Sequence, residues 1–440
     1  MTASKLILVP LTVVVTSCYF FPFVPMMLPA ANSKMLLAVV GLLCLAYSLI
    51  KKHDGAIDRD FLVLSLYAFG ISLIAMLSMA LNNTADNTFA AYFMSMWVWL
   101  GGAYAVITLI KAVHGGVSVP LTVNYLIAVC VVQCFLALLF DSNPVAENWH
   151  TATFGGEGYM GNTAGSSRLH GIGCSLDVAG FRFAAVILMA TVLMSIDDSS
   201  INQYIYIAAI FIIAIIGDFI SRSTVFGVIL GSVYLLFRSL FVKVSSRGIM
   251  GKLFMLSLIS VIVCIILYNT NAGARENIRF GFEGFFSLVE HGHWQTHSND
   301  ILRSMVVWPD NLRTWLIGDG FFNNPNDDTL ATFDPFYVGP DYHGYYKGTD
   351  IGYLRYIYYF GLVGLCLLIM YFIRVCKICC WRFPLFKWMF ILILVLNLIQ
   401  WFKVSSDLFV VFAPFLCISR KENEDYMPGE EEFEREVISA

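Results

Sequence analysis

Long runs of apolar residues, separated by shorter polar segments, make up most of this chain. A helix needs about 20 consecutive apolar residues to cross the hydrocarbon core of a bilayer. The pattern therefore predicts an all-α, polytopic integral membrane protein with about 12 transmembrane helices. The predicted spans cover approximately residues 6–25, 33–50, 61–81, 90–110, 120–140, 177–196, 203–218, 223–242, 253–269, 350–373, 387–402 and 407–419.

Composition supports a membrane location. Of 440 residues, 58% are hydrophobic and 13% are charged, and the mean hydropathy is +0.73, whereas an ordinary soluble domain carries about 25% charged residues. The net charge of −4 adds little, because the distribution of charge between the two sides of a membrane matters more than its sum. The first apolar run lacks a clear small-residue cleavage site, so we expect a retained span and not a removed signal peptide.

The basic residues predict the orientation of the helices. Cytoplasmic loops carry an excess of lysine and arginine, and such residues fill alternate loops when the N-terminus is placed inside. Both termini are therefore predicted to be cytoplasmic. The basic residues of the predicted inner loops are Lys51, Lys52, Arg59, Lys111, Lys243, Arg247, Lys252, Arg374, Lys377, Arg382 and Lys387.

The predicted spans divide the chain into four parts. Residues 1–270 form nine helices and include a smaller outer loop at 141–176. Residues 271–349 form a large polar and aromatic outer loop that we expect to cap a site, and 350–419 form the last three helices. The Glu-rich tail, 420–440, is predicted to be disordered. Because the late loop has no counterpart in the first half, the chain lacks the matched halves common in secondary transporters.

Ionisable residues stand at the outer ends of several predicted spans, where they are costly and mark either a site or an ion pair. They fall on the same predicted face of the membrane, together with Arg168 and His170. Structural ion pairing within each segment remains an alternative to a shared site. The pairs that could form locally are Asp177–Arg182, Asp218–Arg222 and Asp350–Arg355.

The outer segments use arginine in preference to lysine. Within 271–349 there are four arginines and one lysine. The planar guanidinium binds phosphate oxygens through two parallel hydrogen bonds, which the lysine ammonium cannot do. An arginine cluster above an apolar bundle therefore suits a polyanionic headgroup carried on a lipid tail.

The histidines of the outer loop have a spacing that could bring imidazoles together at His291, His293 and His297. They lack a nearby cysteine and an H-E-x-x-H pattern, so we predict no metal site there. Contacts with substrate or solvent are the expected role. The aromatic run 333–346, which includes His343, could stack on sugar rings or could equally pack the loop itself.

The chain resembles the Wzy-type O-antigen polymerases and, more distantly, the O-antigen ligases. The resemblance rests on the order and the sidedness of four motifs, each of which is weak alone. In chain order these are Arg168-Leu169-His170-Gly171 with Ser175-Leu176-Asp177-Val178-Ala179-Gly180; Ser221-Arg222-Ser223-Thr224; Ser298-Asn299-Asp300 with Arg303, Trp308-Pro309 and Gly318-Asp319-Gly320; and Asp350-Ile351-Gly352-Tyr353 with Gly361-Leu362-Val363-Gly364.

The resemblance implies glycosyl transfer between two oligosaccharides linked to undecaprenyl diphosphate, at the periplasmic face of a bacterial inner membrane. It implies no metal or other cofactor and no nucleic acid; the expected partners are the two lipid-linked substrates, membrane lipids, a flippase and a chain-length regulator. Asp350 is the first choice for the general base that accepts the proton of the attacking hydroxyl, and His343 is the second. The residues expected to bind diphosphate or glycan are Arg168, His170, Arg222, Arg279, Arg303 and Arg355.

Three alternatives stay open at this stage. An O-antigen ligase is disfavoured because alignment on Gly361 and Gly364 puts Asp350 where the ligases have a histidine. A flippase or exporter of the same lipids would line its cavity with charges along several helices, whereas here the charges lie at the outer rim. A membrane scaffold without activity leaves the outer arginine cluster unexplained.

Overall fold

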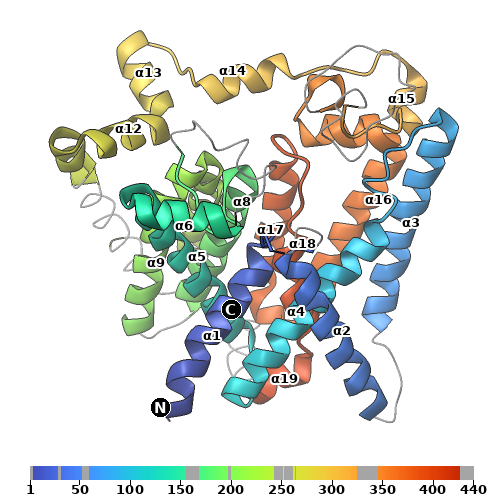
Figure 1. Ribbon diagram of the computed structural model, residues 1–440, viewed down its shortest axis with the longest axis horizontal. Coiled ribbons are helices and arrows are strands. Elements are labelled where there is room, and N and C mark those ends of the chain that lie inside the picture. The colour runs from blue at the N-terminus through green and yellow to red at the C-terminus, as the bar shows by residue number, and fades with distance from the viewer. Residues whose placement is uncertain are drawn as a thin grey trace.

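The computed structural model is all-helical in the part of the chain that it describes (Figure 1). The described residues are 3–27, 31–51, 59–154, 168–196, 200–241, 251, 261–262, 264–324 and 345–426. In chain order the helices are α1 (Ala3–Phe20), α2 (Ser33–Lys51), α3 (Arg59–Asn82), α4 (Tyr92–His114), α5 (Val119–Ser142), α6 (Pro144–Phe154), α8 (Leu176–Ile196), α9 (Ser200–Ile220), η1 (Arg222–Thr224), α10 (Val225–Phe241), α12 (Ala272–Gly281), α13 (Glu283–His291), α14 (His297–Ser304), α15 (Leu312–Ile317), η2 (Tyr346–Gly348), α16 (Gly352–Arg382), η3 (Pro384–Phe386), α17 (Lys387–Gln400), α18 (Phe409–Leu416) and α19 (Arg420–Tyr426).

Eight of the described helices are long and apolar enough to cross a membrane: α2, α3, α4, α5, α8, α9, α10 with η1, and α16. Two further apolar helices, α1 and α17, are shorter. These ten coincide with predicted spans one to eight, ten and eleven. The twelfth prediction, 407–419, corresponds to α18, whose eight residues extend only about 12 Å and fall short of a bilayer core. Most of the ninth predicted span, 253–269, lies outside the described residues.

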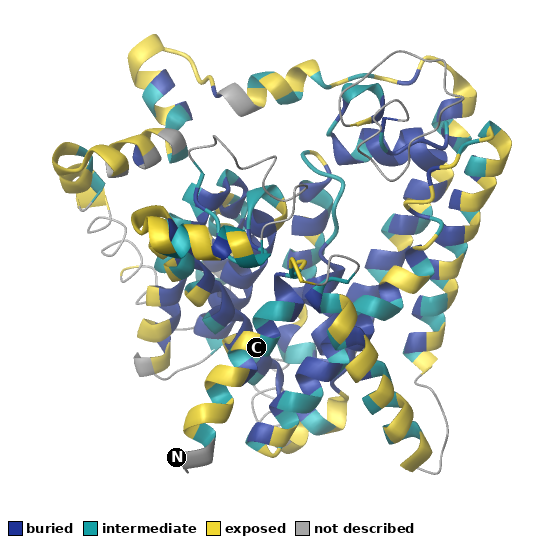
Figure 2. Ribbon diagram, in the orientation of Figure 1, coloured by how far each residue is buried: buried dark blue, intermediate teal, exposed yellow. Residues whose placement is uncertain are grey.

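Helix α8 lies at the centre of one half of the bundle. Nearly its whole length is buried, and it packs against α5, α9, α10 and α17. A helix that is apolar on all sides belongs inside a helical bundle. Figure 2 shows buried residues, in dark blue, gathered in the interior of the bundle. By contrast, large apolar side chains of α1, α2 and α3 are exposed, among them Ile7, Leu43 and Leu66. Such exposure on long apolar helices suits contact with lipid.

One end of the bundle carries α12, α13, α14 and α15, and we call it the loop face (Figure 1). Helix α12 packs on α9, while α15 packs on α16. The opposite end carries the start of α1 and the C-terminal helix α19. At that end Arg382 ties the bundle together, since it pairs with Asp60 at 2.7 Å and donates to the backbone oxygen of Leu416 at 2.8 Å.

Helices α2 and α4 cross at a point where both carry glycine. A β-carbon added to Gly41 would lie 1.8 Å from the backbone oxygen of Gly101, and one added to Gly101 would lie 2.9 Å from the backbone oxygen of Ala38. Small residues at such crossings let helix backbones approach closely, and that contact is a main source of helix association in membranes.

We expect Gly41→Val to destabilise the protein by about 1–3 kcal/mol, the usual cost of inserting methyl groups into a packed contact. The measurement is the thermal unfolding midpoint of the purified protein in detergent. Ala46→Val is the matched control, because Ala46 lies exposed on the same helix. Equal midpoints for the two variants would contradict the close crossing.

Candidate functional site

A polar cluster lies at the loop face, where four separate segments of the chain meet. Asp177 is in the first turn of α8, Ser221 and Ser223 are at the α9–η1 turn, and Lys403 follows α17. The Asp177 Oδ1 accepts hydrogen bonds from Ser221 Oγ at 2.8 Å, Ser223 Oγ at 2.6 Å and Lys403 Nζ at 2.8 Å. Lys403 Nζ also donates to Ser223 Oγ at 3.2 Å. One carboxylate oxygen therefore joins α8, η1 and the end of α17.

Arg355, in the first turn of α16, holds the adjoining part of the site together. Its Nη1 donates to Ser405 Oγ at 2.6 Å and lies 3.6 Å from Asp350 Oδ1, and its Nη2 donates to the backbone oxygen of Phe322 at 3.2 Å. The guanidinium also lies over the ring of Tyr345, 3.9 Å from its centroid, a favourable cation–π distance. The local ion pair of Asp350 with Arg355, which the sequence left open as an alternative to a shared site, is present. Because Ser405 is two residues from Lys403, the two halves of the site share one turn of chain.

Asp350 has a carboxyl pKa well above the usual value for aspartate. Burial raises the pKa of its carboxyl to about 6, Arg355 and Lys403 lower it, and the negative charge of Asp177 raises it. The charges of Asp177 and Lys403 thus act directly on Asp350. Above pH 6 the carboxylate is free to accept a proton, and a pKa close to neutrality suits a general base.

Irregular backbone between α17 and α18 supplies two of these contacts. Trp401 and Leu408 are buried at its two ends, and residues 403–407 are half-buried. The start of α16 docks on this segment, since the Tyr353 amide donates to the Trp401 oxygen at 2.9 Å. Non-helical backbone at membrane depth is tolerated only where protein covers it or where it lines a polar cavity. The twelfth predicted span is therefore not a regular transmembrane helix, and the irregular segment contributes Lys403 and Ser405 to the site.

Helix α16 is broken one turn below the site, at Phe360 and Gly361, and the outer loop docks into the break. Gly361 has φ +67° and ψ −174°, a conformation available essentially only to glycine. The break frees backbone oxygens, and the turn at Gly318–Gly320 satisfies them: the Asp319 amide donates to Tyr358 at 2.6 Å and the Gly320 amide to Tyr359 at 3.2 Å. The Gly-Asp-Gly motif thus fixes the outer loop to α16.

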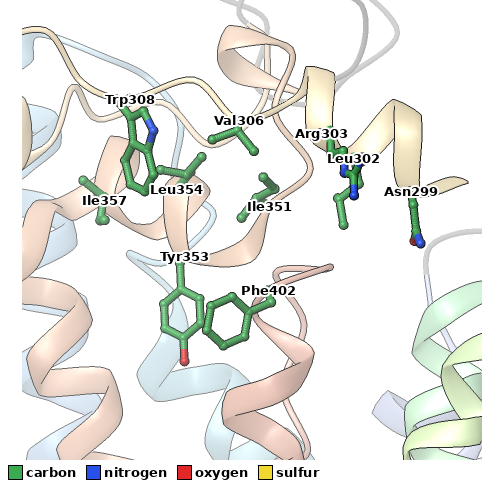
Figure 3. Close-up of a pocket in the computed structure, with 10 residues that line it drawn as sticks. All are labelled: Asn299, Leu302, Arg303, Val306, Trp308, Ile351, Tyr353, Leu354, Ile357 and Phe402. Atoms are coloured by element: carbon green, nitrogen blue, oxygen red, sulfur yellow. The ribbon is translucent and has the colours of Figure 1, made fainter. Parts of the chain in front are cut away.

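An apolar groove of about 610 Å³, lined by Ile351 among others, runs between α14 and the start of α16 (Figure 3). Figure 3 shows Arg303 and Asn299 on α14 at one end of this groove, with the rings of Tyr353 and Phe402 below. Those two rings are 4.9 Å apart between centroids. The remaining lining residues are Leu302, Val306, Trp308, Leu354 and Ile357. Apart from Arg303 and Asn299 the groove suits a hydrocarbon chain.

Arg222 holds the outer loop on the other side of the site. It lies between Ser221 and Ser223 and pairs with Glu283 at the start of α13, Nη2 to Oε2, at 2.7 Å. A β-carbon on Gly281 would lie 2.8 Å from Asp218 Oδ2, so the end of α12 rests directly on α9. The loop is therefore anchored at two points, to η1 through Arg222 and to α16 through the Gly318–Gly320 turn.

The other predicted site residues lie apart from this cluster or cannot be placed. Arg279 is exposed on α12 and pairs with Glu290 at 2.8 Å. Arg168 and His170 stand beside the end of α9 and α6, where His170 Nε2 lies 3.3 Å from Glu147 Oε1. His343 lies outside the described residues, as does the aromatic run up to residue 344.

The local ion pair of Asp177 with Arg182, which the sequence left open as an alternative, is not the pair that Asp177 forms. Asp177 pairs with Lys403, 226 positions further along the chain, at 2.8 Å. Arg182 is buried, and its Nη1 donates to the backbone oxygen of Phe20 at 2.5 Å. Asp177 sits in the first turn of α8 and faces the loop face, whereas Arg182 lies more than a turn deeper, where α1 ends.

No protein-family model matches this chain, and no curated protein or solved structure matches it. The structure thus defines a class, an all-helical protein with several helices fit to cross a membrane and a polar site at one end. Its function is argued from that site.

Proposed function

We propose that the protein joins lipid-linked oligosaccharide repeat units into a polysaccharide, as a Wzy-type polymerase does, at the periplasmic face of a bacterial inner membrane. One observation carries the proposal: Asp350, whose pKa is near 6, lies beside Arg355 and directly precedes Ile351, which lines an apolar groove together with Arg303. A glycosyl transfer from a lipid diphosphate needs these three elements together: a base, cationic side chains and a place for a lipid.

The reaction divides among these residues as follows. The acceptor hydroxyl oxygen attacks the anomeric carbon of the donor glycan, and its proton passes to the Asp350 carboxylate. The bond between the anomeric carbon and the diphosphate oxygen breaks, and the electron pair leaves with the diphosphate. Arginine and lysine fixed beforehand by hydrogen bonds stabilise that developing charge without reorganising, which is the role we give to Arg222, Arg355 and Lys403.

The groove accommodates part of the polyprenyl tail. Its apolar lining by Trp308, Leu354 and Ile357 would remove hydrocarbon from water, and Arg303, which also lines it, would be the side chain to meet the first phosphate. Burial of each CH₂ group contributes about 0.8 kcal/mol, so even a short stretch of tail anchors the substrate. The rest of the polyprenyl tail stays in the lipid bilayer.

The test uses a bacterial strain from which the gene is deleted, complemented with wild type or variants, and its surface glycan separated by size. We expect wild type to produce a ladder and Arg222→Ala to produce a single repeat on the anchor. Arg374→Ala is the matched control, because Arg374 lies near the opposite end of the bundle beside Asp60. Glu283→Gln breaks the same ion pair as Arg222→Ala, so a ladder that survives in Glu283→Gln assigns Arg222 to substrate and not to loop anchoring.

Two outcomes would contradict the proposal in favour of its rivals. An anchor left bare in the deletion strain while polymer accumulates on the lipid carrier indicates a ligase. Single lipid-linked repeats accumulating at the cytoplasmic face indicate a flippase. An unchanged ladder in the deletion strain rejects all three functions.

A further inference from the structure

A second group of polar side chains lies apart from the proposed catalytic site, between α6 and the segment that precedes α8. Glu147 and His150 are three residues apart on α6 and therefore share one face of that helix. His170 approaches them from the segment that precedes α8, directly before the small turn that the bridge between Gly171 and Cys174 closes. The Glu-x-x-His spacing on a helix is one that metal-binding helical bundles use.

The three side chains have the geometry of a ligand set. One potential donor atom from each lies within 4.8 Å of the others, and His170 Nε2 is 3.3 Å from Glu147 Oε1. Around a tetrahedral zinc ion with bonds of about 2.0–2.1 Å, neighbouring ligand atoms are about 3.4 Å apart. The distances therefore require only small side-chain adjustments to surround one ion.

Hydrogen bonding leaves this group unsatisfied. His150 is fully buried, and within the described part of the chain neither of its ring nitrogens has a hydrogen-bond partner. His170 Nε2 and Glu147 Oε2 also have no hydrogen-bond partner among the described residues. An ion pair between Glu147 and a protonated His170 would still leave both nitrogens of His150 unpaired. Buried polar groups without a protein partner are rare in native proteins and are commonly satisfied by a bound ion or water.

The surroundings also suit an ion. The ring of Phe140 lies 4.6 Å from that of His150 between centroids, and Phe154 lies at 5.9 Å. Such an apolar wall limits access of water and strengthens the interaction between a cation and the Glu147 carboxylate. Among the described residues, this is also the sole group of three potential metal ligands that lie within such reach.

We propose that Glu147, His150 and His170 bind a divalent transition-metal ion, best matched by zinc. Two imidazoles and one carboxylate are a donor set that zinc favours, and they leave its fourth position to a water molecule or another oxygen. The ion clasps α6 to the segment that begins at Arg168, and so fixes the entry of the chain into α8. His170 is then a metal ligand, in contrast to the glycan contact and the absence of metal that the sequence resemblance implies. This proposal does not depend on the proposed glycosyl transfer.

The test is the zinc content of the full-length protein, purified in detergent through an affinity tag that lacks histidine. The protein is loaded with Zn²⁺, dialysed against metal-free buffer and analysed by mass spectrometry for metals. We expect about one zinc ion per wild-type chain and loss of most of it in His150→Ala and Glu147→Gln. His293→Ala is the matched control, because His293 is exposed on the outer loop, and it should retain zinc as wild type does.

A second measurement guards against variants that simply fail to fold. A chelator should lower the thermal midpoint of wild type and of His293→Ala, since an ion bound to the folded state stabilises it. It should leave the midpoint of Glu147→Gln unchanged. Wild type that keeps no zinc, or a Glu147→Gln variant that keeps as much as wild type, would overturn the proposal.

Discussion

Asp350→Asn should abolish chain extension while the protein still folds and inserts in the membrane. Asparagine has nearly the same shape and can still accept a hydrogen bond from Arg355, but it cannot take the proton of the acceptor hydroxyl. Loss of a general base costs about 10²–10⁴ in rate, which is enough to reduce a ladder to single repeats. The measurement is polymer length in the complemented deletion strain, with the thermal midpoint of the purified variant as a check on folding.

The same assignment predicts a pH dependence. Because burial raises the pKa of Asp350 to about 6, the carboxylate is ionised above pH 6 and protonated below it. Initial rates in membrane vesicles should therefore be nearly constant at pH 7–8 and fall about tenfold per pH unit well below pH 6. Asp350→Asn should have only a residual rate, and that rate should not fall below pH 6.

Asp310→Asn is the matched control, because Asp310 is an exposed carboxylate on the same outer loop. It should leave both the ladder and the pH profile unchanged. A full-length ladder from Asp350→Asn would remove Asp350 from the mechanism. The undescribed His343, our second choice for the base, would then be the next side chain to replace.

Sequence periodicity located the long apolar helices because each span is a local pattern, but it did not predict the shorter helices α6, α12, α13, α14, α15 and α19, which lie in segments expected to be loops or a disordered tail. Helices α2, α3, α4, α5 and α8 begin and end within a few residues of the predicted ranges. The prediction was wrong at 407–419 because the run there is as apolar as a true span. Hydropathy alone cannot show that the backbone at 401–408, which includes Lys403 and Ser405, is irregular. The signal present in the sequence was Lys403 itself, a lone basic residue on the predicted outer side.

The site was predictable only in its local parts. Asp350 and Arg355 are one helical turn and a residue apart, so their pairing could be inferred from spacing. The partner of Asp177 could not, since Lys403 is 226 positions away and only the packing of α8 against α17 brings them together. The Glu147, His150 and His170 group was missed for the same reason: its two α6 residues have a recognisable spacing, but the third comes from another segment.

The second large effect concerns the Asp177–Lys403 pair. We expect Asp177→Asn to destabilise the protein by about 3 kcal/mol, because removing one partner of a largely buried pair leaves the other charge without compensation. The side chains of Lys403 and Asp177 are only 26% and 19% exposed, so water relieves little of that cost. The thermal midpoint in detergent measures it.

Lys111→Met provides the control at the opposite end of the bundle. Lys111 pairs with Glu422 at the same distance, 2.7 Å against 2.8 Å, but those side chains are 30% and 40% exposed. Water screens a more accessible pair more strongly and so reduces its contribution, so the control should lower the midpoint less than Asp177→Asn does. Equal losses in Asp177→Asn and Lys111→Met would mean that the cluster at the loop face is no more buried than an ordinary surface ion pair.

The double variant Asp177→Asn with Lys403→Met separates the structural role of this pair from its part in the reaction. It removes both charges, while the asparagine oxygen still accepts from Ser221 and Ser223, so most of the lost stability should return; buried pairs replaced by neutral side chains are often tolerated. Under the proposed mechanism activity should not return, because the lysine that we assign to the leaving diphosphate is gone. A stable double variant that still makes a full ladder would show that Lys403 only holds the fold, and would leave Arg222 and Arg355 to neutralise the diphosphate.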